Sequence, residues 1–137
     1  MRTIVNKKIE AKIENLYPLL DSIDQTIRSY SVDEELLATL HICIEEVFVN
    51  VVSYAYGEQV GLVEVETEVN DGWLSITFRD EGIPYNPLER EDPDLDLALE
   101  ERPIGGLGIY MIRNMMDSVQ YEYKEGRNNL CIRKEIY

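Results

Sequence analysis

Apolar and polar residues alternate along this chain with two different periods, and these periods predict its helices and strands. Over residues 16–30 apolar side chains recur at spacings of three and four, which is typical of an amphipathic helix. Over residues 62–69 apolar and polar residues alternate one by one, which predicts a strand with one face in water. Asn-Asp-Gly at 70–72 predicts a hairpin turn, because glycine tolerates the positive φ of such turns. Residues 73–78 would then form the return strand.

A long helix is expected between residues 31 and 56. Ser31-Val32-Asp33-Glu34 reads as a capping box, in which the Ser31 hydroxyl bonds the amide of Glu34 while the Glu34 carboxylate reaches back. Gly57 follows the last helical residue and is a typical residue for the end of a helix. The expected buried stripe of this helix consists of Leu36, Leu37, Leu40, Ile44, Val47, Phe48, Val51 and Ala55.

Shorter patterns complete the expected secondary structure. They predict a strand over 2–10, a helix over 107–116, and strands over 119–123 and 130–136 that are joined by a turn at 126–129. Residues 80–104 are irregular, proline-containing and acidic, so they are expected to form a mobile flap rather than part of the core. Hairpins with helices between them predict helices packed on one face of a mixed or antiparallel sheet.

Chain length and charge narrow the classes of function. A chain of 137 residues fits one domain, 1–137, and is long enough to bury a core without a metal or a disulfide. Asp and Glu number 27 against 13 Lys and Arg, which gives a net charge of −14. Such a surface repels phosphate backbones, so direct nucleic-acid binding is not expected and a basic protein partner is favoured.

Other features of the sequence favour the cytoplasm. Cys43 and Cys131 lie far apart in apolar runs, which indicates two buried free thiols in a reducing compartment rather than a disulfide or a metal site. The first residues contain no apolar signal-peptide segment, and no stretch approaches ~20 uninterrupted apolar residues. We therefore expect a cytoplasmic protein without a membrane segment.

A polar column on the long helix is the first candidate for chemistry. Glu46, Asn50 and Tyr54 are four residues apart, so they share a face beside the apolar stripe. Asn50 could offer its carbonyl oxygen to Mg²⁺, a cation that also keeps water and phosphate ligands. Glu46 could then accept a proton from a nucleophile that attacks a γ-phosphate. A solvated strip with Glu–Asn contacts is the alternative.

The cluster Asp-Glu-Gly-Ile-Pro at 80–84 is the second candidate, directly after a predicted strand. The Asp80 carboxylate could accept a hydrogen bond from an adenine amino group. Gly82 lacks a Cβ, so a purine could lie against the backbone there. Pro84 belongs to the same expected nucleotide contacts. An ordinary turn after a strand would have a similar sequence.

The third candidate is a group of glycines at the start of the last predicted helix. Gly105, Gly106, Leu107 and Gly108 place backbone amides at a helix N-terminus, where the helix dipole favours an anion such as a phosphate. Alone, the same residues are compatible with a flexible hinge. The pattern is neither a Walker loop nor a dinucleotide fingerprint.

In this order and spacing, the three clusters resemble the ATPase superfamily that groups DNA gyrase, the large heat-shock chaperone, sensor histidine kinases and mismatch-repair MutL. Within it, the chain is most similar to the small bacterial anti-sigma factors with serine-kinase activity. The matching residues are Ile-Glu-Glu-Val-Phe-Val-Asn at 44–50, Tyr-Ala-Tyr-Gly at 54–57, Arg-Asp-Glu-Gly-Ile-Pro-Tyr-Asn-Pro at 79–87 and Gly-Gly-Leu-Gly-Ile-Tyr-Met-Ile at 105–112.

The resemblance implies an α+β fold of the Bergerat type, a two-layer α/β sandwich with helices on one face of a mixed, mostly antiparallel sheet. It implies that ATP binds with Asp80 and Gly82 at adenine, with Asn50 at Mg²⁺, and with the glycines at 105, 106 and 108 on the phosphates. It implies that Glu46 is the catalytic base.

The resemblance also implies an anti-sigma factor that phosphorylates an antagonist protein on serine or threonine, sequesters a sigma factor and forms a homodimer. Two positions depart from the family pattern. Tyr54 stands where the family often has histidine, and the last strand shows no clear match for a small hydroxyl residue near the adenine. Two alternatives therefore remain. One is a nucleotide-binding regulatory module without phosphoryl transfer. The other is a binding domain without a nucleotide, or a carboxylate-based hydrolase.

Overall fold

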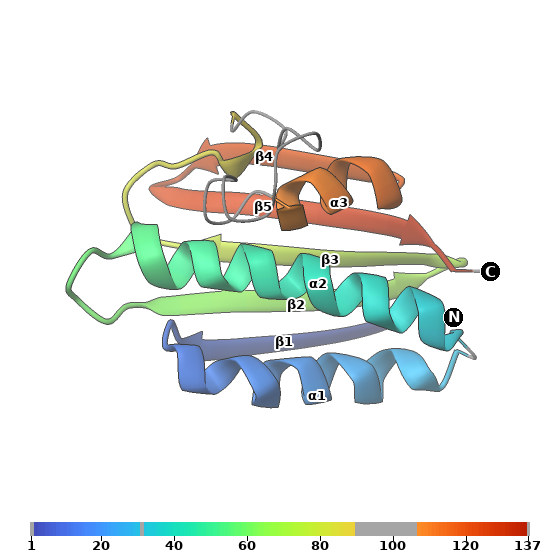
Figure 1. The fold of residues 1–137 in the computed structure, drawn as a ribbon. Coiled ribbons are helices and arrows are strands. Elements are labelled where there is room, and N and C mark those ends of the chain that lie inside the picture. Colours follow the sequence, from blue (N-terminus) through green and yellow to red (C-terminus); the bar gives the residue numbers. More distant parts are fainter. Residues whose placement is uncertain (1, 31, 90–106, 137) are drawn as a thin grey trace, which may run out of the picture.

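A computed structural model of the chain describes residues 2–30, 32–89 and 107–136. In this part of the chain, one five-stranded sheet lies behind a layer of helices (Figure 1). The strands lie in the order β1-β2-β3-β5-β4 and pair antiparallel throughout. Their bounds are β1 (Arg2–Glu10), β2 (Leu62–Asn70), β3 (Trp73–Asp80), β4 (Ser118–Lys124) and β5 (Arg127–Glu135).

The helices all lie on the same face of the sheet (Figure 1). In that view α1 lies beside β1, α2 runs across β2 and β3, and α3 lies in front of β5. The predicted α+β sandwich is therefore confirmed, although the pairings between the described strands are antiparallel rather than mixed. The helical bounds are α1 (Leu16–Arg28), α2 (Glu34–Asn50) and α3 (Leu107–Met115), with 3-10 turns at Ile13–Asn15 and Pro87–Glu89 and a π-helical turn at Val51–Ala55.

The core lies between this helical layer and the sheet, as the periodic apolar positions of the helices and strands predict. Along β2, Val63, Val65 and Val69 are buried, while the glutamates between them face the uncovered side of the sheet. The segment Glu34–Ala55 is long and apolar enough to cross a membrane, but half of its most apolar 18-residue window, which has a mean hydropathy of 1.6, is buried inside the fold. Its apolar character is therefore explained by its place as the central core helix.

The start of α2 differs from the predicted capping box. Asp33 is the N-cap, and its Oδ1 accepts a hydrogen bond from the Leu36 amide at 2.7 Å. Ser31, the predicted cap, lies outside the described residues. An aspartate at this position both bonds a free amide of the first turn and places negative charge at the positive end of the helix dipole. At the other end of the helical run, Gly57 has a φ of 62°, as expected for a residue that ends a helix.

The turn between β4 and β5 also differs from the prediction, which placed it at 126–129. It consists of Glu125 and Gly126 alone, and both residues have positive φ, 55° and 76°. This is the geometry of a tight two-residue hairpin, which the predicted 70–72 turn also adopts at Asp71 and Gly72. Residues 127–129 are therefore strand residues, and this shift brings Asn128 directly opposite Asp80 on β3.

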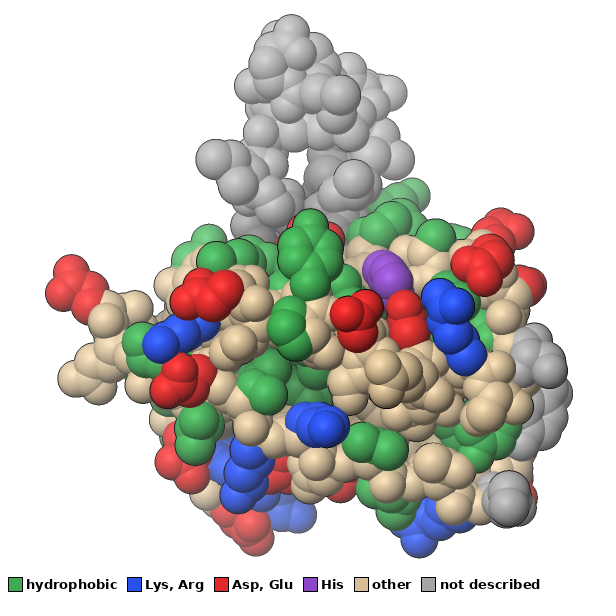
Figure 2. Space-filling view, turned by 90° about the horizontal axis from the view of Figure 1, so that it is seen from below, with side chains coloured by type: hydrophobic (Ala, Val, Ile, Leu, Met, Phe, Trp, Pro, Cys, Tyr) green, Lys and Arg blue, Asp and Glu red, His purple; other side chains and the backbone are tan. Residues whose placement is uncertain are grey.

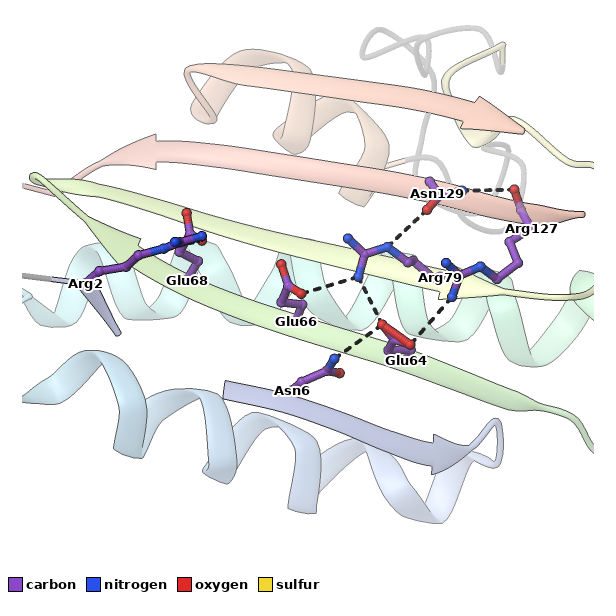
Figure 3. Close-up of polar contacts among 8 residues, drawn as sticks. All are labelled: Arg2, Asn6, Glu64, Glu66, Glu68, Arg79, Arg127 and Asn129. Carbon is purple, nitrogen blue, oxygen red and sulfur yellow. Dashed lines mark hydrogen bonds and ion pairs between the residues drawn. The ribbon is translucent and has the colours of Figure 1, made fainter. Parts of the chain in front are cut away.

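No described helix covers the second face of the sheet, which we call the open face. Glutamates of β2 pair there with arginines of β1, β3 and β5 (Figure 3). The shortest of these contacts join Arg2 to Glu68 at 2.8 Å and Arg79 to Glu64 at 3.1 Å. In the view of Figure 2, from the α1 side, acidic and basic side chains likewise lie beside one another rather than in separate patches.

The two cysteines differ in environment. Cys43 is fully buried in the core, as predicted, and burial raises the pKa of its thiol to about 11. Cys131 is only partly buried, because it lies on the open face opposite Thr77, so the prediction that both thiols are buried is wrong for this residue. Both are free thiols, as expected.

Candidate functional site

A cleft lies between the end of α2, the end of β3 and the start of β5. Its walls are mainly apolar, and a few polar side chains reach it from three separate elements. The apolar walls include Val47, Phe78 and Leu130, and the buried polar side chains are those of Asn50, Asp80 and Asn128.

Asn50 is the last residue of α2, and its side chain is buried at the cleft. Its Nδ2 donates a long hydrogen bond of 3.5 Å to Oε1 of Glu46, one turn earlier and partly buried. Because the amide nitrogen is the atom turned to Glu46, the carbonyl oxygen is the atom that could bind a cation. The π-helical turn that follows places Val51 and Ala55 on the same cleft, and such turns are frequent at functional sites.

Asp80 is the last residue of β3 and is also buried. Its Oδ1 accepts two hydrogen bonds, from the Gly82 amide at 2.9 Å and from Nδ2 of Asn128 at 2.8 Å. Both bonds fall on the same oxygen, so Oδ2 has no partner within the described parts of the chain. The site therefore presents one carboxylate oxygen that is held by the protein and one that remains for a ligand.

Burial raises the pKa of the Asp80 carboxyl above its ordinary value, and the bonds from Asn128 and Gly82 oppose that rise. Desolvation acts in this direction because it penalises the charged form of an acid. A raised pKa means that the folded chain binds a proton at Asp80 more readily than the unfolded chain does. Acidification should therefore neutralise this carboxylate at a higher pH than it does an exposed aspartate.

Gly82 packs against the π-helical turn. A Cβ at this position would lie 2.1 Å from the carbonyl oxygen of Ala55, and the next amide, of Ile83, donates to that same oxygen at 2.8 Å. The Glu81 amide donates to the hydroxyl of Tyr56 at 2.9 Å. The close approach of Ala55 is by itself a reason for glycine here, a reason distinct from the purine contact that the sequence suggested.

Asn128 is a buried polar residue of the cleft that the sequence reasoning missed. The turn predicted at 126–129 placed it in a loop, and the segment expected to match the small hydroxyl residue of the family begins one residue later, at Asn129. In the structure its side chain bonds Asp80, the loop after β3, and Tyr121 of β4. The signal that could have found it is Gly126, because a two-residue turn ending there makes Asn128 the second residue of the next strand.

The other predicted site residues are placed as follows. Pro84 is exposed in the loop after β3. Leu107 and Gly108 are the first residues of α3, which packs against α2. Gly105 and Gly106, and with them most of the predicted flap, lie outside the described residues. The structure thus brings Asn50 and Asp80 to one cleft and leaves the phosphate-binding role of the glycines as a prediction.

Tyr54 replaces the histidine of the family pattern and is exposed at the π-helical turn. Its ring lies 5.2 Å from the ring of Tyr85, which lines the cleft. The tilted arrangement is a favourable aromatic contact. Tyr54 therefore packs against the Tyr85 wall of the cleft from its outer side.

The described residues contain no group of three His, Cys, Asp or Glu side chains that could hold a metal ion. A Mg²⁺ at Asn50 would therefore depend on phosphate and water for most of its ligands. Mg²⁺ commonly binds in this way in nucleotide sites, through one or two protein groups together with the substrate phosphates. The neutral oxygen of Asn50 with Glu46 beside it fits that type of site.

Comparison with protein families gives a match that spans most of the chain. Residues 9–134 match the family of the histidine kinase-like ATPase domain. Curated relatives include the proteins named serine-protein kinase RsbW from Bacillus thuringiensis and Bacillus cereus, each 33% identical over 91 residues. That alignment covers 64% of this chain and 57% of each relative, so the chain spans little more than half the length of the relatives it matches.

Comparison with solved structures agrees on the fold. The crystal structure of the RsbU and RsbW domains of a Mycobacterium tuberculosis protein superposes with a TM-score of 0.69. The match covers 98% of this chain and 32% of that one, at 14% sequence identity. At this identity the likeness concerns the arrangement of helices and strands alone.

Proposed function

This chain belongs to the histidine kinase-like ATPase family, and from that premise we propose that it is an ATP-dependent protein-serine/threonine kinase of the anti-sigma type. The observation that carries the proposal is the shared cleft of Asn50 and Asp80, with Oδ2 of Asp80 left for a ligand. The curated relatives named serine-protein kinases support the same activity.

In the proposed complex, adenine enters the apolar part of the cleft and its amino group donates to Oδ2 of Asp80. The carbonyl oxygen of Asn50 would hold Mg²⁺, which would supply positive charge to offset that of the phosphates. The backbone amides of Gly105, Gly106 and Gly108 bind the phosphates at the start of α3. Leu107 and Pro84 complete the contacts at the two ends of the nucleotide.

Glu46 is proposed as the general base. The hydroxyl oxygen of a substrate serine attacks the γ-phosphorus of ATP, and the bond from that phosphorus to the bridging oxygen of ADP breaks. The Glu46 carboxylate takes the proton of the hydroxyl, so the products are phosphoserine, ADP and protonated Glu46, which later releases its proton to water. Asn50 holds Glu46 from one turn away and so helps to orient it.

The proposed substrate is an anti-sigma antagonist protein, and the proposed second partner is a sigma factor that the chain sequesters in the cytoplasm. ATP and ADP could select between these partners, if the nucleotide orders residues around the cleft differently in the two states. The charge of −14 favours a partner with a basic surface and disfavours direct contact with nucleic acid.

The test combines binding with transfer. We expect ATP–Mg²⁺ at ~100 times its dissociation constant to raise the free energy of unfolding by about 2.7 kcal/mol. We also expect labelled phosphate to pass from ATP to a serine of the cognate antagonist. Stabilisation without label, with a working control kinase, would favour the regulatory module that binds nucleotide without transfer. Absence of stabilisation would exclude the ATP site itself.

We further propose that the chain is a homodimer that associates through the open face. By strand register, this face carries as many basic as acidic side chains, on a chain whose total charge is −14. Two copies would repel one another least there. The basic set is Arg2, Lys8, Arg79, Lys124, Arg127 and Arg133, and the acidic set is Glu10, Glu64, Glu66, Glu68, Glu122 and Glu135.

Cys131 on the open face provides a probe for this association. As protein concentration rises, we expect the reactivity of its thiol to fall in step with dimer formation measured by sedimentation. The buried Cys43 should stay unreactive in the folded chain, because burial also raises the pKa of its thiol. A chain that is monomeric at all concentrations, or a dimer in which Cys131 reacts fully, would contradict this interface.

A further inference from the structure

We propose that Asn128 is a positioning residue for the nucleotide, which acts by fixing the Asp80 carboxylate so that a single oxygen is presented to the ligand. The inference rests on the proposed nucleotide site and adds a residue to it. Asn128 and Asp80 are directly opposite each other on β5 and β3. Both side chains are buried, each with 6% of its surface exposed.

The side chain of Asn128 makes four hydrogen bonds. Its Nδ2 donates to Oδ1 of Asp80 and to the carbonyl oxygen of Ile83, both at 2.8 Å. Its Oδ1 accepts from the amide of Tyr85 at 3.1 Å and from the hydroxyl of Tyr121. One side chain thereby connects β3, the loop after it, and β4.

These four bonds leave the Asn128 side chain no free donor or acceptor for a direct contact with a ligand. A carboxamide has two N–H donors and two acceptor lone pairs, and all four are used inside the protein. Its influence on a nucleotide must therefore pass through Asp80 and through the loop at residues 83–85. A serine hydroxyl has one donor and ends one bond nearer the backbone than Nδ2 of asparagine, so it cannot replace the bonds to Asp80 and to the Ile83 carbonyl.

The bond to Asp80 has an electrostatic consequence as well as a geometric one. A donor that bonds a carboxylate favours the charged form, which is the form that can accept from an adenine amino group. At Asp80 this bond opposes the effect of burial, which raises the pKa. Without Asn128, the pKa of Asp80 should rise further, and ATP binding should weaken at a higher pH during acidification.

Asn128→Ser tests this inference, with Asn129→Ser as the matched control. Asn129 is the next residue, but it faces the open side and bonds Arg79 (Figure 3). The measurements are the carbon-13 NMR titration of the Asp80 carboxyl and the affinity for ATP–Mg²⁺ as a function of pH. We expect Asn128→Ser to raise the pKa of Asp80 and to weaken ATP binding at neutral pH by roughly tenfold or more. Asn129→Ser should change neither.

An unchanged Asp80 titration in a folded Asn128→Ser variant would overturn the positioning role. If that variant does not fold, the wild-type chain still decides the matter. The chemical shifts of the Asn128 side-chain amide should then change as Asp80 titrates. Shifts that stay constant over this titration would overturn the inference. A wild-type chain that binds no ATP, while Asp80 still responds to Asn128, would refute the proposed function and leave the electrostatic coupling intact.

Discussion

Replacing Glu46 with glutamine is expected to slow phosphoryl transfer to serine by ~10²–10⁴-fold, the usual contribution of a general base. Glutamine keeps the shape of glutamate and can still accept the hydrogen bond from Nδ2 of Asn50. It cannot take a proton at neutral pH. The affinity for ATP–Mg²⁺ should therefore stay within a few-fold of wild type, and rapid-quench phosphorylation of the antagonist would measure the loss.

Glu45→Gln is the matched control for this experiment. Glu45 is the neighbouring residue of α2 and is exposed, and it points about 100° away around the helix. The substitution Glu45→Gln removes the same charge and leaves the proposed base in place. Equal losses in the two variants would show that the charge of the helix matters rather than proton transfer, and the role of Glu46 would have to be abandoned.

Asp80→Asn is expected to weaken nucleotide binding by roughly 10²-fold or more without unfolding the protein. The variant loses an acceptor that is charged, and a hydrogen bond to a charged group contributes about 1.5–3 kcal/mol. It also turns an N–H donor toward the amino group of adenine, where two donors would face each other. Calorimetric titration with ATP–Mg²⁺ would measure the loss, and full retention of affinity would exclude Asp80 from the adenine site.

The same variant should be at least as stable as wild type at neutral pH. Because burial raises the pKa of Asp80, its favourable contribution to stability is complete below the ordinary aspartate pKa and is lost as pH rises through the raised value. The asparagine has no such loss, while its carbonyl oxygen can still accept from Gly82 and Asn128. Urea unfolding at acidic and neutral pH measures this. The free energy of unfolding of the variant, relative to wild type, should increase as pH rises.

Several predictions from the sequence depended on local patterns and succeeded for that reason. The alternation at 62–69 and the apolar stripe of the long helix each report which face of an element is buried, and the structure buries those faces. The turn at Asp71-Gly72 follows from the backbone freedom of its glycine. The three clusters also identified the family, which the match over residues 9–134 confirms.

Gly82 is a residue whose contact could not be predicted from local sequence. From sequence, a glycine after a strand suggests either a turn or a close approach, and the nature of the approaching group is open. The structure shows that the group is the carbonyl of Ala55, at the end of a helix that is distant in the sequence. Which atom fills the place of a missing Cβ depends on the packing of two elements, and no local pattern encodes it.

By itself, then, the sequence determined the order of helices and strands, the buried faces of the long helix and of the 62–69 strand, and the family to which the site residues point. The tertiary structure decided which side chains meet. Asn128 became part of the site because a two-residue turn set the register of β5, and that register placed it opposite Asp80, 48 residues away. The physical reason is range: periodicity and capping act within a few residues, whereas strand register and buried hydrogen bonds are fixed only when distant segments pack together.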